Sequence, residues 1–150
     1  MPARLYDYVE ANGQNPITGW INGLPKKYRA RVNAKLGMLA LYGDETLPGF
    51  VTSAVGSGSV KEVVINGDLA LRLLLCRGPL DMGRNGTNGN TGKKSPWVAP
   101  EYTLLCGAEE RDSRYVPRDA VMQAEGRRQV ILNNPDRRVP HAHVGPADTK

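Results

Sequence analysis

The stretch Ser59–Arg77 constrains the fold of this chain more than any other part of the sequence. Two apolar runs, Val60–Ile65 and Leu69–Leu75, flank the dipeptide Asn66-Gly67. Asn-Gly between two apolar runs is a strong signal for a β-hairpin, because both residues tolerate the backbone angles of a tight turn. The sequence therefore predicts two paired strands joined by a tight turn at Asn66-Gly67.

A single charged residue, Arg72, interrupts the second apolar run. An unpaired guanidinium is costly to bury, so Arg72 must lie on a solvent-exposed face or be held by polar partners. We interpret Arg72 as lying on the open face of a small antiparallel sheet, where a ligand can reach it. The alternative, which the sequence leaves equally open, is an ordinary surface arginine or one paired with a carboxylate.

The residues before the hairpin have helical periodicity. Asn15-Pro16 is a typical helix start, with Asn able to cap free amides and Pro suited to the first helical position. A second helix is predicted from Pro25 to about Tyr42, after a Gly-x-Pro joint. Apolar residues recur three or four apart in each: Ile17, Trp20, Ile21 and Leu24 in the first, and Tyr28, Val32, Leu36, Leu39 and Ala40 in the second. The two form a predicted helical hairpin.

The remaining segments are less regular. Residues Arg4–Val9 are compatible with a first strand, and Tyr102–Cys106 with a later one. Between the strands, Gly78–Pro100 is rich in glycine and almost free of apolar residues, which predicts a long mobile loop. A third helix is predicted at Arg118–Leu132, opened by Pro117 and ended before Pro135. One domain then spans residues 1–132, and residues 133–150 form a polar tail that is solvated or dependent on a partner.

Composition places few limits on the partners of the chain. Its 150 residues suit one domain, and its net charge of +5 modestly favours an acidic partner such as nucleic acid. No apolar run is long enough to span a membrane, and the first residues do not resemble a signal peptide, so we expect a cytoplasmic protein. Cys76 and Cys106 are interpreted as buried thiols of a reducing compartment, a disulfide between neighbouring strands being the minor alternative. The pair His141 and His143 offers too few ligands for a metal site, and nothing implies a cofactor.

Three segments of the chain carry a resemblance to a known protein family. Residues 15–43 read NPITGWINGLPKKYRARVNAKLGMLALYG, residues 60–75 read VKEVVINGDLALRLLL, and residues 104–129 read LLCGAEERDSRYVPRDAVMQAEGRRQ. In this order and spacing they resemble the RelE/ParE superfamily of toxins, and the phage-derived branch of HigB-like toxins most closely. The resemblance implies an α+β fold with a small twisted antiparallel sheet, an N-terminal helical hairpin packed on one face and a C-terminal helix nearby.

The resemblance also implies a function. It points to a toxin of a type II toxin–antitoxin-like system, a metal-independent endoribonuclease that cuts mRNA, usually on the ribosome, and is silenced by a cognate antitoxin protein. In such chemistry a 2′-hydroxyl attacks the adjacent phosphorus, which requires a base, a cation for the phosphorane charge and an acid for the leaving oxygen.

The resemblance assigns candidate residues to these tasks. Arg72 contacts the scissile phosphate, Glu62 or Glu110 serves as base, and Tyr115 stacks on a base or transfers a proton. The candidate RNA-binding residues are Lys61, Arg111, Arg114, Arg118, Lys27 and Arg31. For Lys27 and Arg31, a solvated helix face is the alternative.

Some positions differ from the usual pattern of the branch and favour other functions. Val64 stands where the branch usually has a second strand arginine. In the last strand the branch usually has a histidine and an aromatic residue followed by a basic pair, and this chain has Cys106, Ala108 and Glu109-Glu110 there. Carboxylates repel a phosphate, which favours a non-catalytic phage or prophage protein that uses the same scaffold to bind a host protein. A gyrase poison of the ParE type is the third possibility.

Overall fold

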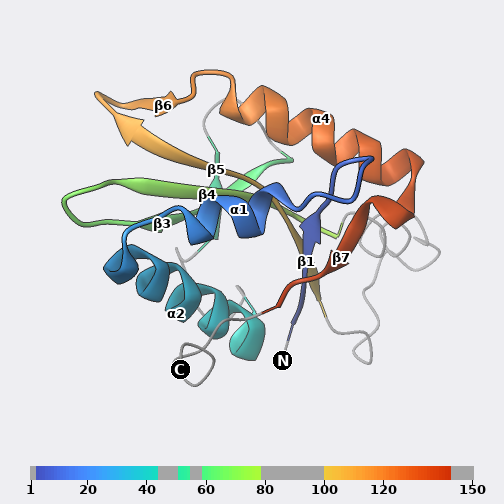
Figure 1. Cartoon of the computed structure of the whole chain (residues 1–150), viewed down its shortest axis with the longest axis horizontal. Coiled ribbons are helices and arrows are strands. Elements are labelled where there is room, and N and C mark those ends of the chain that lie inside the picture. The colour runs from blue at the N-terminus through green and yellow to red at the C-terminus, as the bar shows by residue number, and fades with distance from the viewer. Residues whose placement is uncertain (1–2, 44–50, 55–58, 79–99, 143–150) are drawn as a thin grey trace.

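The computed structural model describes residues 3–43, 51–54, 59–78 and 100–142, which form a mixed α+β fold (Figure 1). The strands are β1 (Arg4–Tyr8), β2 (Val51–Ser53), β3 (Lys61–Ile65), β4 (Leu71–Arg77), β5 (Glu101–Arg111), β6 (Arg114–Val116) and β7 (Arg138–Pro140). The helices are α1 (Pro16–Asn22), α2 (Lys26–Tyr42), α4 (Ala120–Asn133) and the short 3-10 helix η1 (Pro135–Arg137). Among the described residues, no helix has the length and apolar character that crossing a membrane requires.

The predicted helical hairpin is confirmed. The side chain of Asn15 caps α1 by accepting the backbone N–H groups of Ile17 and Thr18, at 3.0 and 2.9 Å, and Pro16 opens the helix as expected. The third predicted helix also exists, although α4 begins at Ala120 rather than at Arg118.

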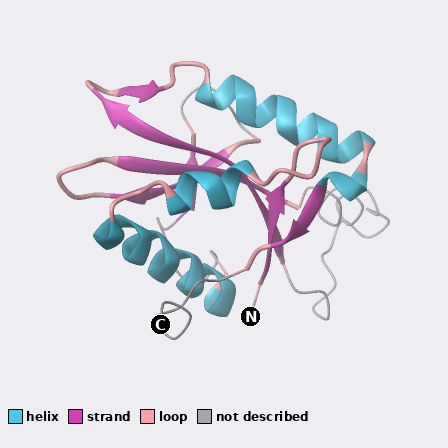
Figure 2. Ribbon diagram, viewed as in Figure 1, coloured by secondary structure: helices cyan, strands magenta, loops and turns pink. Residues whose placement is uncertain are grey.

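The strands form one seven-stranded sheet with the order β2-β3-β4-β5-β1-β7, and β6 pairs with β5 (Figure 2). The expectation of an antiparallel sheet is wrong at one pair, because β1 runs parallel to β5. The helices α1 and α2 lie between these two strands in the sequence, together with three further strands. Such a distant pairing has no local signal, since neither strand needs a turn that joins it to the other.

The sheet is covered on both faces, which explains why β4 is apolar at consecutive positions. One cluster of buried side chains lies between the sheet and α1 and α2, and contains Leu71, Leu73 and Leu75 of β4. A second cluster lies between the sheet and α4, and contains Leu74 and Cys76. Alternate residues of β4 thus fill different cores. We call these two sides the α2 face and the α4 face.

The β3–β4 hairpin is confirmed, but its predicted tight turn is wrong. Ile65 pairs with Leu71, so residues 66–70 form the connection, and Gly67 does not have a positive φ. A Cβ atom on Gly67 would lie 2.6 Å from the Tyr28 hydroxyl oxygen. Glycine is therefore needed at this position because α2 approaches the loop closely, not because of the turn geometry.

Three side chains of α2 hold this loop. The Tyr28 hydroxyl accepts the Leu69 N–H at 2.8 Å, the Arg31 Nη1 donates to the Asn66 carbonyl at 2.8 Å, and the Lys27 Nζ lies 3.3 Å from a carboxylate oxygen of Asp68. Lys27 and Arg31 thus have structural contacts on the α2 face.

The C-terminal segment corrects a further expectation. Residues 135–142 were expected in a solvated tail, but β7 adds to the sheet by pairing with β1. The side chain of His141 is 3% exposed, and its Nδ1 lies 2.7 Å from an Asp7 carboxylate oxygen. The domain therefore does not end at residue 132. The predicted mobile loop lies, apart from its first and last residues, outside the described residues, as do His143 and the rest of the tail.

Candidate functional site

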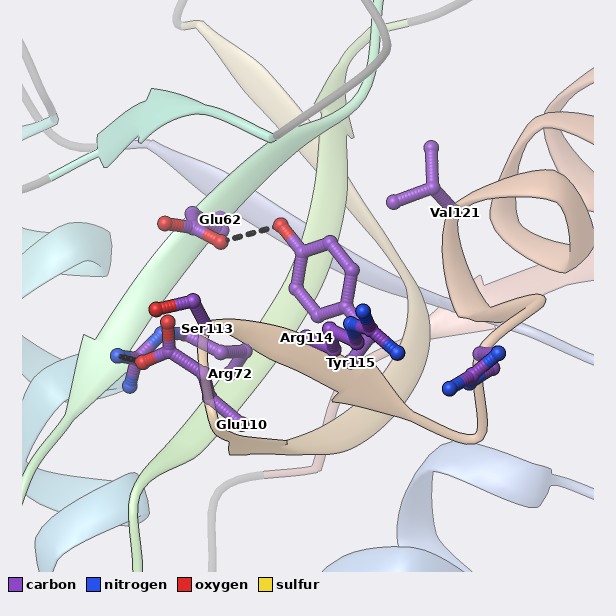
Figure 3. Close-up of a pocket in the computed structure, with 8 residues that line it drawn as sticks. Glu62, Arg72, Glu110, Ser113, Arg114, Tyr115 and Val121 are labelled. Carbon is purple, nitrogen blue, oxygen red and sulfur yellow. Dashed lines mark hydrogen bonds and ion pairs between the residues drawn. The ribbon is translucent and has the colours of Figure 1, made fainter.

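A pocket of about 500 Å³ opens on the α4 face of the sheet (Figure 3). Its lining contains all four candidate catalytic residues and two of the candidate RNA-binding residues. The lining residues are Glu62, Arg72, Glu110, Ser113, Arg114, Tyr115, Arg118 and Val121. The structure thus brings together side chains from β3, β4, β5, β6 and the start of α4.

The positions of Glu62 and Arg72 follow from strand alternation. Arg72 is two residues before Leu74, which belongs to the cluster beneath α4, so both side chains lie on the α4 face. Glu62 pairs with Leu74 across β3 and β4 and shares that face. The single charge in this apolar run correctly indicated that Arg72 differs from the other residues of β4.

The position of Glu110 depends on a bulge in β5. Leu74 pairs with Cys106 while Leu75 pairs with Leu104, so Leu105 is an extra residue without a partner on β4. A bulge reverses the alternation of all later residues in a strand. Because of it, Glu110 lies on the α4 face with Arg72 instead of on the α2 face. No feature of the apolar run around Leu105 signals this reversal.

A tight hairpin that the sequence did not predict places Tyr115. The turn residues Asp112 and Ser113 have φ angles of 52° and 65°, the left-handed conformation that two-residue hairpin turns require. The turn pairs Glu110 with Tyr115. The Tyr115 hydroxyl donates to the Glu62 carboxylate at 2.6 Å (Figure 3).

Arg72 lies against the pocket but is held by several partners. Its Nη2 donates to the Glu110 carboxylate in an ion pair, and its Nη1 donates to the Leu71 carbonyl at 2.9 Å and to the Asn66 side-chain oxygen at 3.4 Å. The side chain of Arg72 is 11% exposed and that of Glu110 is 35% exposed. The expectation that Arg72 lies on an open face of the sheet is therefore wrong, because α4 covers that face and the Arg72 side chain is paired with a carboxylate, as the alternative had it.

The other candidate cations divide into two groups. Arg114 and Arg118 are exposed at the pocket, and neither side chain has a hydrogen bond or ion pair within the described part of the chain. Arg111 forms an ion pair with Glu109 at 3.0 Å, and Lys61 does not line the pocket. Lys27 and Arg31 contact the β3–β4 loop on the opposite face. The pocket thus gathers three arginines and two glutamates.

Sequence reasoning missed two lining residues. Ser113 reaches the pocket because it forms the hairpin turn, and Val121 because it lies in the first turn of α4. Val121, Ala124 and Ile131 recur at helical spacing in the third predicted helix, which indicates that Val121 lies on its inner side. A sequence signal therefore exists for Val121 but not for Ser113.

No group suited to metal binding is present within residues 3–43, 51–54, 59–78 and 100–142, where three or more His, Cys, Asp or Glu side chains would be needed together. The two thiols are buried. Burial raises the pKa of Cys76 to about 12 and also raises the pKa of Cys106. A thiol with a raised pKa is a poor nucleophile near neutral pH.

Comparison with protein-family models, with curated proteins and with solved structures found no match to this chain.

Proposed function

We propose that this protein is a metal-independent endoribonuclease that cleaves mRNA, acting as a toxin of a type II toxin–antitoxin-like system of the RelE/HigB type. The observation that carries the proposal is the gathering of Arg72, Glu62, Glu110 and Tyr115 around one pocket. The order strand, helix, helix, sheet and C-terminal helix also supports it. Its partners would be mRNA, the ribosome and a cognate antitoxin, and it would act in the cytoplasm.

The hydrogen bond between Tyr115 and Glu62 provides a path for the proton. The Glu62 carboxylate takes the proton of the RNA 2′-hydroxyl as the 2′ oxygen attacks phosphorus. The bond from phosphorus to the 5′ oxygen breaks, and the leaving oxygen takes the Tyr115 hydroxyl proton. Tyr115 then recovers a proton from Glu62, so the net reaction moves one proton from the 2′ to the 5′ oxygen. The products are a 2′,3′-cyclic phosphate and a 5′-hydroxyl.

The arginines supply the positive charge that the reaction needs. A phosphorane carries extra negative charge, and fixed guanidinium groups stabilise it more than they stabilise the substrate. Arg114 and Arg118 can bind phosphate oxygens without breaking a contact to a described residue, and planar guanidinium groups suit phosphate geometry.

The test is primer-extension mapping of a reporter mRNA in a reconstituted translation reaction, with and without ribosomes. We expect new 5′ ends with the wild-type protein. Tyr115→Phe removes the transferable proton and keeps the ring, so the cleavage rate should fall by roughly 100-fold or more. If Tyr115→Phe cleaves as fast as the wild type, the proposed proton path is wrong.

Arg114 and Arg111 offer a matched pair of variants. Both are exposed residues of the β5–β6 hairpin, and only Arg114 lines the pocket. We expect Arg114→Ala to slow cleavage about tenfold or more, because a charge-assisted contact to phosphate is lost, and Arg111→Ala to have a much smaller effect. Equal effects of the two changes would point to general electrostatic attraction instead of a defined site.

The second candidate function is that of a non-catalytic binding protein of phage or prophage origin. The ion pair between Arg72 and Glu110, which leaves Arg72 only 11% exposed, favours it. In that case no new 5′ ends appear at any protein concentration, and a pull-down returns one stoichiometric host protein without ribosomes.

A further inference from the structure

The carboxylate of Glu110 occupies the side of Arg72 that a substrate phosphate would use. Both residues line the pocket, and the Arg72 Nη2 donates to Glu110 Oε1. The Arg72 Nη1 is already bound to the Leu71 carbonyl and the Asn66 side chain. An incoming anion therefore meets a guanidinium whose pocket-facing nitrogen is bound to a carboxylate of the same chain.

We propose that Glu110 is an internal competitor of the RNA phosphate for Arg72, so that the site is closed until a phosphodiester displaces the carboxylate. This inference rests on the proposed function and adds its regulation. It assigns Glu110 a role opposite to that of a catalytic base.

The backbone around Glu110 favours a displacement confined to the side chain. The Glu110 N–H donates to the Ala70 carbonyl at 2.8 Å, and Glu110 pairs with Tyr115 across β5 and β6. These contacts hold the main chain when the carboxylate turns away. The Glu110 side chain is 35% exposed, so the displaced carboxylate can enter water.

The neighbouring residue Glu109 shows that the pairing is selective. Glu109 forms an ion pair with Arg111 at 3.0 Å and does not line the pocket. The bulge at Leu105 decides which of the two adjacent carboxylates reaches Arg72. Glu109→Gln therefore removes the same charge from the same strand and leaves the Arg72 ion pair intact.

The test measures binding separately from cleavage. Fluorescence anisotropy follows a labelled 2′-O-methyl oligoribonucleotide, which lacks the attacking hydroxyl and cannot be cut. If Glu110 occupies Arg72 in roughly 80 to 90% of molecules, Glu110→Gln should bind about five- to tenfold more tightly than the wild type. Glu109→Gln should change the affinity much less, and Arg72→Ala should abolish the gain of Glu110→Gln.

A wild-type affinity equal to or tighter than that of Glu110→Gln would overturn the proposal, as would an absence of binding by every variant. Failure of the proposed function is seen separately, as an absence of new 5′ ends with the wild type. Cleavage by Glu110→Gln at or above the wild-type rate, together with tighter binding, supports the competition, whereas loss of cleavage in Glu110→Gln would contradict the role assigned to Glu110.

A second measurement uses the wild-type protein alone and so does not depend on the folding of a variant. NMR of the Arg72 side-chain Nε–H group in the wild type, titrated with inorganic phosphate, should show a shift that saturates, because phosphate displaces Glu110. A resonance that phosphate leaves unchanged would contradict the proposal.

Discussion

Gly107 lies where the indole ring of Trp20 crosses β5. A Cβ atom at this position would overlap the Trp20 ring, and Trp20 packs from α1 against the core of the α2 face. The absence of a side chain at Gly107 therefore allows α1 to approach the sheet. This is a requirement of packing, since Gly107 does not have a positive φ.

We predict that Gly107→Ala lowers the free energy of unfolding by roughly 1 to 3 kcal/mol, because the Trp20 ring or α1 must move. Urea denaturation measures this change. Trp20→Leu in the same chain should recover part of the loss, since the smaller side chain makes room.

The matched control is Gly126→Ala in α4, where a Cβ atom would meet nothing within 4 Å. Alanine is a better helix former, so this change should stabilise the protein by about 1 kcal/mol. If Gly107→Ala changes the free energy of unfolding in the same direction and by the same amount as Gly126→Ala, the role assigned to Trp20 is contradicted.

At the scale of elements, the C-terminal segment η1–β7 completes the sheet and covers a buried carboxylate. Asp7 is 1% exposed, and its two oxygens contact His141 Nδ1 at 2.7 Å and Asn15 Nδ2 at 2.9 Å. The backbone of the segment also binds β1, through the His141 N–H to the Leu5 carbonyl at 2.9 Å. Because Asn15 also caps α1, Asp7 links the segment to the helical hairpin.

We predict that His141→Ala lowers the free energy of unfolding by about 1 to 3 kcal/mol, because a buried carboxylate loses a hydrogen-bond partner. Thermal or urea unfolding measures the effect. Val139→Ala, in the adjacent strand β7, is the control. Val139 is 37% exposed, so its truncation should change stability by roughly 0.5 kcal/mol or less. Equal effects of the two changes would indicate that His141 contributes only apolar contact.

At the scale of the whole molecule, the layer between the sheet and α4 contains both thiols, and only unfolding exposes them. Burial raises the pKa of Cys76 from 9.0 to about 12. The folded state then retains the proton at pH values where the unfolded state has lost it. The Cys76 contribution to stability is complete below the unfolded pKa and falls as the pH rises toward the folded pKa.

We predict that Cys76 alone makes the free energy of unfolding fall by about 1.4 kcal/mol between neutral pH and about pH 10, because over this interval the thiol loses its proton in the unfolded state but keeps it in the folded state. Urea denaturation of the wild type and of Cys76→Ala at both pH values isolates this contribution. Cys76→Ala lacks the titrating group, so its stability should fall less over the same interval. Tyr8 also has a pKa that is raised by burial and by Glu10, but its ionisation affects the free energy of unfolding of both proteins equally. Parallel pH profiles for the two proteins would contradict the prediction.

The sequence by itself determined the elements whose signals are local. Helix periodicity and the Asn15 cap predicted α1 and α2, and the apolar runs around Asn66 predicted the paired strands β3 and β4. These signals depend on residues a few positions apart, which is the range over which propensity and periodicity act. The candidate site was predictable to the same degree: Arg72 was identified because a charge within an apolar strand is unusual.

Only the tertiary structure decided how the elements meet. The parallel pairing of β1 with β5, the addition of β7 and the need for glycine at Gly67 all depend on segments far apart in the chain. The bulge at Leu105 has the largest consequence, because one extra residue moves Glu110 to the face of Arg72. Its position depends on the packing of both sheet faces at once, and an apolar run in a strand buried on both sides does not specify which residue is the extra one.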